Sequence, residues 1–276
     1  MHLEGSSAIV TGATSGIGGS VAARLADRGV KVYACGRRVE RLESLADLHH
    51  GVLPVELDVR REEDRARLVD TAGPVDHLVN CAGVAYLGLV EEMSQDDLVK
   101  VLETNCLGYF DLARRIVPGM LERGRGNIID IGSSSVWIPG PPLTAYAATK
   151  AAVHAFNVGL RRECMGRGVQ VSVVAPGPVS TEITTASGSG TIGPFLGLFD
   201  ALAGQPEEVA DTIVTMLSRP GWAVPPVRSV PRVVGLLRIL EAPGIDRITD
   251  VGVSVWREVM RRTGHGPAQV PAAPVR

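Results

Sequence analysis

The sequence predicts one α/β domain built on a doubly wound parallel sheet, with helices on both faces of the sheet. Short apolar runs rich in Val, Ile and Leu alternate with amphipathic stretches as far as about residue 175. Strands that are apolar along their whole length are typical of parallel sheets buried on both faces. The chain of 276 residues, with 45% hydrophobic and 21% charged side chains, is long enough for one large domain.

Strands and helices alternate in this first part of the chain. The apolar runs predict strands at 8–10, 30–34, 52–57, 77–79, 127–131 and 169–174. The amphipathic runs between them predict helices at 17–28, 39–48, 61–71, 95–121 and 146–165. Gly29 ends the first helix, and Ser94 is a suitable N-cap for the long fourth helix.

The pattern changes after residue 175. A glycine-rich run predicts a mobile substrate loop over about 182–204, and a proline then opens a helix at 206–217. Prolines and arginines multiply beyond it, with helix candidates at 231–240 and 246–262 and a frayed end at 264–276. We therefore expect a main domain over 1–220 and a C-terminal helical extension, 221–276, packed on the same domain.

Composition narrows the class of protein. The formal net charge of -2 gives no general attraction to nucleic acid. Four widely spaced cysteines suit reduced thiols, and six scattered histidines lack acidic or Cys partners at metal-ligand spacing. The N-terminus is unlike a signal peptide, and no apolar stretch is long enough to span a bilayer. We expect a cytoplasmic protein without a metal site or an integral membrane segment.

Tyr146 and Lys150 are the most informative pair of residues. Four residues apart on a helix, they place a phenol and an ammonium group on the same face, one turn apart. A tyrosine hydroxyl has an ordinary pKa of about 10, and a nearby cation favours the phenolate and lowers that pKa. The pair therefore predicts a general acid/base that carries its own tuning charge.

A glycine-rich loop follows the first strand. The run Thr-Gly-Ala-Thr-Ser-Gly-Ile-Gly, residues 11–18, lies between a predicted strand and a predicted helix. Glycines let the backbone turn sharply beside a ligand, and the helix N-terminus offers unpaired N–H groups to a pyrophosphate. The order of strand, loop and helix favours a Rossmann-type dinucleotide site over an ordinary turn.

Together these motifs resemble those of the short-chain dehydrogenase/reductase family. The chain has Thr-Gly-x-x-x-Gly-x-Gly near its start and Tyr-x-x-x-Lys about 130 residues later. Asn-Cys-Ala-Gly at 80–83 and Pro-Gly-Pro-Val-Ser-Thr at 176–181 also match, and Cys81 is the one departure, where the family usually has asparagine. The resemblance covers about residues 5–220 and implies an NAD(P)-dependent oxidoreductase with one dinucleotide-binding catalytic domain.

The resemblance also implies roles for four residues. Tyr146 exchanges the proton, while Lys150 lowers its pKa and binds the nicotinamide ribose. Ser133 holds the substrate oxygen and stands 13 residues before Tyr146, the usual family offset, although the next two serines, 134–135, are alternatives. Asn105 helps to hold a water that links Lys150 to solvent; the alternative is a polar residue satisfied within its own helix.

The cofactor is expected to contact residues from several loops. The resemblance implies Asp58 at the adenine, Asn80 and Gly83 near the ribose, and Thr181 at the carboxamide. The full expected set of cofactor-binding residues is Gly12, Thr14, Ser15, Gly16, Ile17, Gly18, Arg37, Arg38, Asp58, Val59, Asn80, Ala82, Gly83, Tyr146, Lys150, Pro176, Gly177, Val179 and Thr181.

The end of the second strand favours NADP(H). Arg37 and Arg38 follow it, where a carboxylate commonly binds the ribose 2′-hydroxyl of NAD. A guanidinium fork suits a phosphate, and two cations at a helix start are unfavourable without a ligand. We expect NADP(H), with Arg37 the stronger candidate for the 2′-phosphate, and NAD(H) as the alternative.

The expected substrate is a small hydrophobic ketone or secondary alcohol. The residues expected to wall the site are mostly apolar and lack a cluster of cations: Val136, Trp137, Ile138, Pro139, Pro141, Pro142, Leu143 and the segment 183–199. The alternative is that these side chains pack the loop against the sheet.

The role of the C-terminal extension, 221–276, and the oligomeric state are open to more than one interpretation. Arginines in 221–276 interleave with Val, Leu and Ile, which suits a lid, a subunit contact or a weakly bound membrane-surface segment. A non-catalytic nucleotide-binding regulator is a second alternative, against which the complete catalytic set argues. The resemblance implies a homodimer or homotetramer formed through the helices at 95–121 and 146–165.

Overall fold

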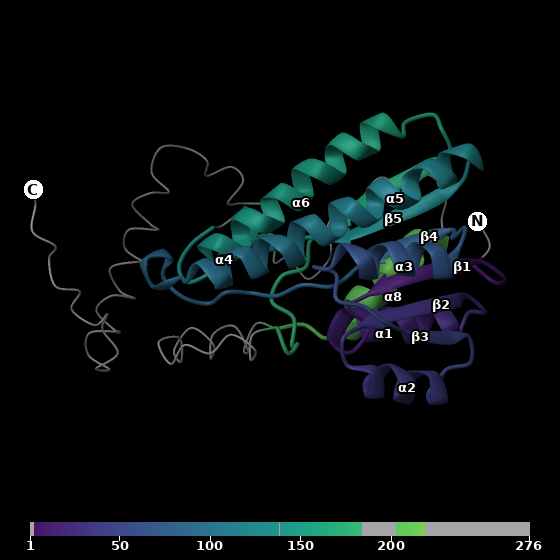
Figure 1. Cartoon of the computed structure of the whole chain (residues 1–276), viewed down its shortest axis with the longest axis horizontal. Coiled ribbons are helices and arrows are strands. Elements are labelled where there is room, and N and C mark those ends of the chain that lie inside the picture. Colours follow the sequence, from purple (N-terminus) through teal and green to yellow (C-terminus); the bar gives the residue numbers. More distant parts are fainter. Residues whose placement is uncertain (1–2, 138, 184–202, 219–276) are drawn as a thin grey trace, which may run out of the picture.

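The computed structural model describes residues 3–137, 139–183 and 203–218. These residues form a six-stranded, entirely parallel sheet with the strand order β3-β2-β1-β4-β5-β6. The chain starts in the middle of the sheet, builds one half outwards to β3, and then crosses back to build the other half from β4 (Figure 1). The predicted doubly wound α/β fold is confirmed.

The predicted elements of the main domain are present. The strands are β1 (Ser7–Thr11), β2 (Lys31–Gly36), β3 (Val52–Glu56), β4 (His77–Asn80), β5 (Gly126–Ile131) and β6 (Val169–Val174). The α-helices are α1 (Gly16–Ala26), α2 (Val39–Leu48), α3 (Glu62–Ala72), α4 (Gln95–Leu102), α5 (Gly108–Glu122), α6 (Thr144–Glu163) and α8 (Pro206–Ser218). Short turns of 3-10 helix are η1 (Val90–Glu92) and η3 (Ser134–Val136).

Helices cover both faces of the sheet and create two apolar cores. On one face α1 packs against α8, and the buried side chains of Val10 and Ile129 reach this core. On the other face lie α3, α5 and α6, and here Ile9 and Ile128 are buried. Alternate residues of a strand point to opposite faces, so each central strand must be apolar along its whole length.

The long fourth helix is not regular, and the prediction of one α-helix over 95–121 needs correction. It begins as predicted, with the Ser94 hydroxyl accepting a hydrogen bond from the Asp97 N–H at 3.1 Å. Between α4 and α5, however, residues Glu103–Leu107 form a π-helical turn, η2. Such wider turns are rare and frequently lie at functional sites. Asn105 lies in this turn.

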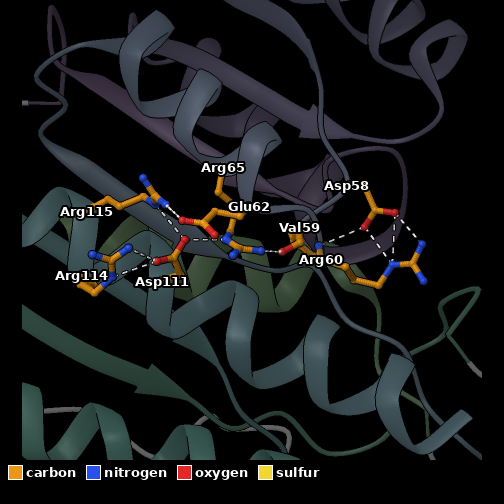
Figure 2. Close-up of polar contacts among 8 residues, drawn as sticks. All are labelled: Asp58, Val59, Arg60, Glu62, Arg65, Asp111, Arg114 and Arg115. Atoms are coloured by element: carbon orange, nitrogen blue, oxygen red, sulfur yellow. Dashed lines mark hydrogen bonds and ion pairs between the residues drawn. The ribbon is translucent and has the colours of Figure 1, made fainter. Parts of the chain in front are cut away.

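Ion pairs connect α3 to α5 on one side of the molecule. Figure 2 shows Asp111 of α5 beside three arginines, with distances of 2.6 Å to Arg65, 2.6 Å to Arg114 and 2.8 Å to Arg115. Arg115 also pairs with Glu62 at 2.9 Å. Burial alone would raise the pKa of Asp111, but the hydrogen bonds from the arginines lower it well below its ordinary value. The buried Arg65 side chain therefore ties the two helices together through an ionised carboxylate.

Several expectations lie outside the described residues. These are most of the expected substrate loop, the helix candidates at 231–240 and 246–262, and the whole extension 221–276. Within the described ranges, none of the helices combines the length and the apolar character that a bilayer crossing needs.

Candidate active site

A cleft of about 310 Å³ runs along the carboxyl ends of the strands. Open α/β sheets bind their ligands at this edge, where the strand order reverses. The residues that line the cleft come from the ends of five strands and the loops after them, from the end of α4 and from the π-helical turn η2: Gly12, Thr14, Ser15, Gly16, Ile17, Gly18, Cys35, Gly36, Arg37, Arg38, Leu57, Asp58, Val59, Arg60, Cys81, Ala82, Gly83, Val84, Ala85, Lys100, Thr104, Thr181, Glu182 and Ile183.

The loops after β1 and β4 meet at Gly12. This residue has a φ of +69°, which favours glycine, and an added Cβ would lie 2.8 Å from the Cα of Ala82. The Thr11 hydroxyl fixes the same contact by accepting hydrogen bonds from the N–H groups of Cys81 and Ala82, at 3.0 and 3.1 Å. The wall of the cleft is therefore bare backbone at the position where a dinucleotide phosphate needs close approach.

At the far side of the cleft, Asp58 and Val59 are held in place by arginines. The Asp58 carboxylate accepts a hydrogen bond from Arg60 at 2.6 Å, and this bond lowers the pKa of Asp58 below its ordinary value (Figure 2). Arg65 donates a hydrogen bond to the carbonyl of Val59 at 2.7 Å. The loop after β3 is thus held at Asp58, the predicted adenine contact, by Arg60 and at the next residue, Val59, by Arg65.

Arg37 and Arg38 both line the cleft, as their predicted cofactor role requires. Arg38 donates from Nη2 to the hydroxyls of Thr14 and Ser15, at 2.9 and 3.0 Å. These contacts fix its guanidinium against the glycine-rich loop. Arg38 is therefore as well placed as Arg37 to meet a phosphate, and the preference for Arg37 stays a prediction.

Glu182 joins the arginines from across the cleft, a contact that the sequence did not predict. Its two carboxylate oxygens pair with Arg38 at 2.6 Å and with Arg41 at 2.5 Å. The hydrogen bonds from Arg41 and Arg38 lower the pKa of Glu182 to about 2. Glu182 follows Thr181 directly, so its neighbour in the Pro-Gly-x-x-x-Thr motif was the available signal.

Tyr146 and Ser133 form the centre of the catalytic end. Tyr146 lies in the first turn of α6, Ser133 follows β5 closely, and a hydrogen bond joins their side chains. The Ser133 hydroxyl also accepts a hydrogen bond from the Ser135 hydroxyl at 2.9 Å. The N–H of Ser134 instead donates to the carbonyl of Pro176. These contacts favour Ser133 over its two neighbours as the partner of Tyr146.

The pKa of Tyr146 differs from the expectation. Burial raises it to about 12, and the hydrogen bond with Ser133 acts in the opposite direction. The Lys150 Nζ lies 5.8 Å from the centroid of the Tyr146 ring and donates to the carbonyl of Ile131 at 2.7 Å, and the lowering of the Tyr146 pKa by Lys150 stays a prediction. Tyr146 therefore keeps its proton at neutral pH and is a hydrogen-bonded acid.

Lys150 is almost completely buried, with 2% of its surface exposed. Burial lowers its pKa to about 8, although the Asp130 carboxylate acts in the opposite direction. A lysine with this pKa is mostly an ammonium ion at pH 7 but loses its proton at mildly alkaline pH.

Asn105 faces the same place from the π-helical turn. Its amide accepts a hydrogen bond from the Val84 N–H and donates one to the Val84 carbonyl, both at 2.9 Å, and it also donates to the Thr149 hydroxyl. An added Cβ on Gly83 would lie 3.5 Å from the Asn105 Oδ1 and 3.7 Å from the Lys150 Nζ. Gly83 thus joins the cleft to the catalytic end. The contacts with Val84 and Thr149 show that Asn105 is not satisfied within its own helix, the alternative raised from the sequence.

Some expected cofactor residues do not line the cleft. The side chain of Asn80 has no exposed surface and donates a hydrogen bond to Asp130, so the expected contact of this side chain with the ribose needs correction. Pro176, Gly177 and Val179 lie in the turn after β6, outside the described lining of the cleft. Their cofactor contacts stay predictions.

The expected substrate wall is described in part. Ile183 lines the cleft, and Trp137 contacts His154 edge to face with a centroid distance of 6.1 Å. Ile138 and the part of the expected wall at 184–199 lie outside the described residues. The apolar nature of the substrate stays a prediction.

The fold and the site define the chain as a dinucleotide-binding α/β protein of the doubly wound class, with a tyrosine–lysine–serine centre at the edge of the sheet. Residues 6–191 match the family model described as short chain dehydrogenase. The chain belongs to the short-chain dehydrogenase family of oxidoreductases, as its motifs indicated.

Relatives and solved structures agree with this family. The NADP-dependent 3-hydroxy acid dehydrogenase of Salmonella typhi is 43% identical over 178 residues, which cover 62% of this chain and 71% of that protein. The glycine betaine reductase of Emericella nidulans is 35% identical over 230 residues, 79% of this chain but 18% of that much longer protein. The closed form of a serine dehydrogenase with NADP+ is 33% identical, has a TM-score of 0.72, and matches 78% of this chain and 90% of its own.

A further solved structure holds the other nicotinamide cofactor. The 3-ketoacyl-(acyl-carrier-protein) reductase of Brucella melitensis, complexed with NADH, is 26% identical with a TM-score of 0.71. The match covers 79% of this chain and 92% of that chain. Proteins of this fold therefore include structures with each cofactor, and the choice depends on local residues.

Proposed function

We propose that this protein transfers a hydride between NADP(H) and the carbonyl or secondary alcohol carbon of a hydrophobic substrate. One observation carries the proposal: four predicted catalytic residues, from the loop after β5, from α6 and from the π-helical turn, form one connected group beside Gly83, which lines the cleft. These residues are Asn105, Ser133, Tyr146 and Lys150.

The cleft suits a dinucleotide. Gly12 and Gly83 both line it without a side chain, and at Gly12 an added Cβ would collide with the backbone of Ala82. The first turn of α1 lies beside the cleft and has no acidic residue, so its N–H groups and positive dipole are available to a pyrophosphate. When bound, the reduced cofactor supplies the hydride.

The proton is handled by side chains of this chain. Tyr146, protonated at neutral pH, donates its hydroxyl proton to the substrate oxygen, which Ser133 orients by a hydrogen bond. The phenolate that remains is stabilised by Ser133 and by the Lys150 ammonium. An acid of this kind contributes roughly 10²–10⁴-fold to the rate, and its protonated state suits reduction of a carbonyl.

The choice of NADP(H) is supported by the arginines after β2 and by the relatives that use it. The guanidinium of Arg38 is fixed at the cleft, and Arg37 lines the same side. The relative from Salmonella typhi is NADP-dependent, and the serine dehydrogenase structure contains NADP+. We further propose a cytoplasmic homodimer or homotetramer with the catalytic domain over 1–220.

A substrate panel tests the proposal. Hydrophobic ketones and secondary alcohols are mixed with the full chain and each cofactor, and the absorbance of NADPH or NADH is followed. We expect turnover of some ketones with NADPH and slower turnover with NADH. Tight NADPH binding by fluorescence with no turnover across the panel would instead support a nucleotide-binding regulator.

A further inference from the structure

Asp130 is a carboxylate in the interior of the protein, beneath the catalytic end. It lies in β5 with 1% of its surface exposed. It is two residues from Ile128, so its side chain points to the face that α5 and α6 cover. A buried carboxylate is strongly unfavourable unless hydrogen bonds and an opposite charge compensate it. Its presence therefore calls for a compensating group.

Two amides hold the carboxylate. Asn80 of β4 donates to Oδ1 at 2.9 Å, and Asn157 of α6 donates to Oδ2 at 3.0 Å. Asn157 also donates to the carbonyl of Ser172 in β6 at 2.8 Å. Both oxygens of Asp130 thus accept hydrogen bonds, which suits the ionised form. The amides fix the position of the carboxylate but leave its charge unneutralised.

The ammonium group of Lys150 is placed to compensate the negative charge of Asp130. It lies seven residues before Asn157 on α6, so both side chains extend from one face of the helix to β5. Its Nζ donates to the carbonyl of Ile131, the residue after Asp130. Burial raises the pKa of Asp130 and lowers that of Lys150, and each group opposes the shift of the other.

The other titratable groups that face Lys150 are neutral. They are Cys81 at the end of β4, Cys106 in the π-helical turn, Tyr109 of α5 and Tyr146 of α6. Burial raises the pKa of all four groups, that of Cys81 to about 12. Among the residues that the structure describes, Asp130 is thus the anion that acts on the buried ammonium.

We propose that Asp130 is a positioning residue that keeps Lys150 in its ammonium form, as a fixed counter-ion beneath the reacting atoms. Both carboxylate oxygens of Asp130 are held by Asn80 and Asn157 inside the protein, so Asp130 acts through Lys150 rather than by contact with a ligand. The inference rests on the proposed function: as the hydride adds to the carbonyl carbon, Tyr146 gives its proton to the oxygen. The phenolate then needs a cation beside it until solvent returns a proton.

The isosteric variant Asp130→Asn removes the charge with little change of shape. The Oδ1 of Asn80 is buried and has no hydrogen-bond partner among the described residues. After a flip of the Asn80 amide it would accept from the new side-chain amide at 130, so the variant should fold. Asp76→Asn is the matched control, because Asp76 accepts from the Ser7 N–H at the opposite end of the sheet.

An NMR titration tests the inference without any substrate. The chain has three lysines, Lys31, Lys100 and Lys150, so lysine labelled with ¹³C at Cε gives few signals, and Lys150→Met assigns the relevant one. We expect the Lys150 signal to titrate near pH 8 in the natural chain and at least one pH unit lower in Asp130→Asn. Asp76→Asn should match the natural chain. An unchanged midpoint in folded Asp130→Asn overturns the inference.

A pH profile extends the test once a ketone substrate is known. The fall of kcat on the alkaline side should move to lower pH by the same amount as the NMR midpoint. At pH 8–9 a shift of one unit lowers the ammonium fraction, and hence kcat, by roughly 5–10-fold. The KM for NADPH should stay the same. Failure of turnover would count against the proposed function, whereas the NMR midpoint judges the role of Asp130 separately.

Discussion

The arginine side of the molecule and its catalytic end hold their carboxylates in different ways. On the arginine side, formed by α2, α3, α5 and the loops beside them, Asp111 and Glu182 each pair directly with two or more guanidiniums. At the catalytic end, neutral amides hold Asp130, and its influence on Lys150 acts through space. The pKa of Asp111 is lowered, whereas that of Asp130 is raised.

The two arrangements suit different roles for a buried or partly buried carboxylate, one structural and one connected with proton transfer. A carboxylate paired with arginine stays ionised over the working pH range, so it can fix loops and helices but cannot respond to pH. At the catalytic end, burial raises the pKa of Asp130 and lowers that of Lys150 to about 8, so the lysine can respond to pH near neutrality, which suits proton transfer. Changes on the arginine side should therefore alter stability or cofactor affinity, and changes at the catalytic end should alter turnover and its pH dependence.

The largest effect is expected from Tyr146→Phe. The variant lacks the acid but keeps the ring, so kcat should fall roughly 10²–10⁴-fold. NADPH affinity, measured by fluorescence titration, should stay within about twofold, since the arginine side is intact. Tyr33→Phe, a change of a buried tyrosine in β2 away from Ser133, is the control and should retain turnover. Near-normal kcat in Tyr146→Phe would remove the tyrosine from the mechanism.

The next largest effect is a loss of stability in Asp111→Asn. The variant leaves the buried guanidinium of Arg65 without its carboxylate, and breaking such a pair costs about 3 kcal/mol or more. We expect Tm to fall by roughly 5–10 °C, as measured by scanning calorimetry. Glu62→Gln, which removes the exposed partner of Arg115, should change Tm by less than about 2 °C. Equal losses in both variants would contradict the special position of Asp111.

The pH dependence of this effect has a definite sign. The folded pKa of Asp111 is lowered, so its stabilisation is complete above the unfolded pKa of about 3.9 and is lost as pH falls towards the folded value. The difference in Tm between the natural chain and Asp111→Asn should therefore be constant from pH 5 to 8 and shrink below pH 4. A difference that is unchanged at pH 3 would show that the ionised carboxylate is not its cause.

Most of the fold followed from periodicity in the sequence. Val10 and Ile129 are buried in one core, and Ile9 and Ile128 are buried in the other. Because both faces of the sheet are covered, each central strand is apolar along its whole length and can be recognised in the sequence. The π-helical turn at Glu103–Leu107 did not follow from the periodicity, and the contacts of Asn105 in this turn with Val84 join residues 21 positions apart in the sequence.

The site was predictable where a motif is local and unpredictable where it depends on distant contacts. The spacing of Tyr146 and Lys150 placed both on α6, but it could not show that burial raises the pKa of the tyrosine. Asp130 reads in sequence as one residue of an apolar strand, and its amide partners lie 50 and 27 residues away. Contacts of this kind arise only after the sheet has assembled.

Replacement of Arg37 and replacement of Arg38 should have different effects on the affinities for NADPH and NADH. Loss of a hydrogen bond to a charged group costs about 1.5–3 kcal/mol, so Arg37→Ala should raise the Kd for NADPH roughly 10–100-fold and leave that for NADH nearly unchanged. Arg38→Ala should weaken both cofactors, because its guanidinium also holds Thr14 and Ser15 of the glycine-rich loop. Fluorescence titration measures all four constants. Equal effects of Arg37→Ala on both cofactors would contradict the NADP(H) assignment.

The smallest effect, and the one that tests the arginine side most directly, is expected from Glu182→Gln. The Glu182 carboxylate occupies guanidinium donors of Arg38 and Arg41 that the 2′-phosphate of NADPH would also use. Because these pairs are about half exposed, we expect a modest gain: the Kd for NADPH falls roughly 2–5-fold, with no change for NADH.

Two controls, a change of ionic strength and the variant Glu40→Gln, separate the effect of the direct Glu182–arginine contact from the effect of the net surface charge. Raising the ionic strength to about 1 M shortens the Debye length to about 3 Å and should reduce the advantage of Glu182→Gln. Glu40→Gln removes a charge from the first turn of α2, where no pairing with Arg38 is described, and should tighten NADPH less. If both variants tighten NADPH equally, the effect belongs to the net charge of the surface. Weaker NADPH binding in Glu182→Gln would instead make Glu182 a support that positions the arginines for the phosphate.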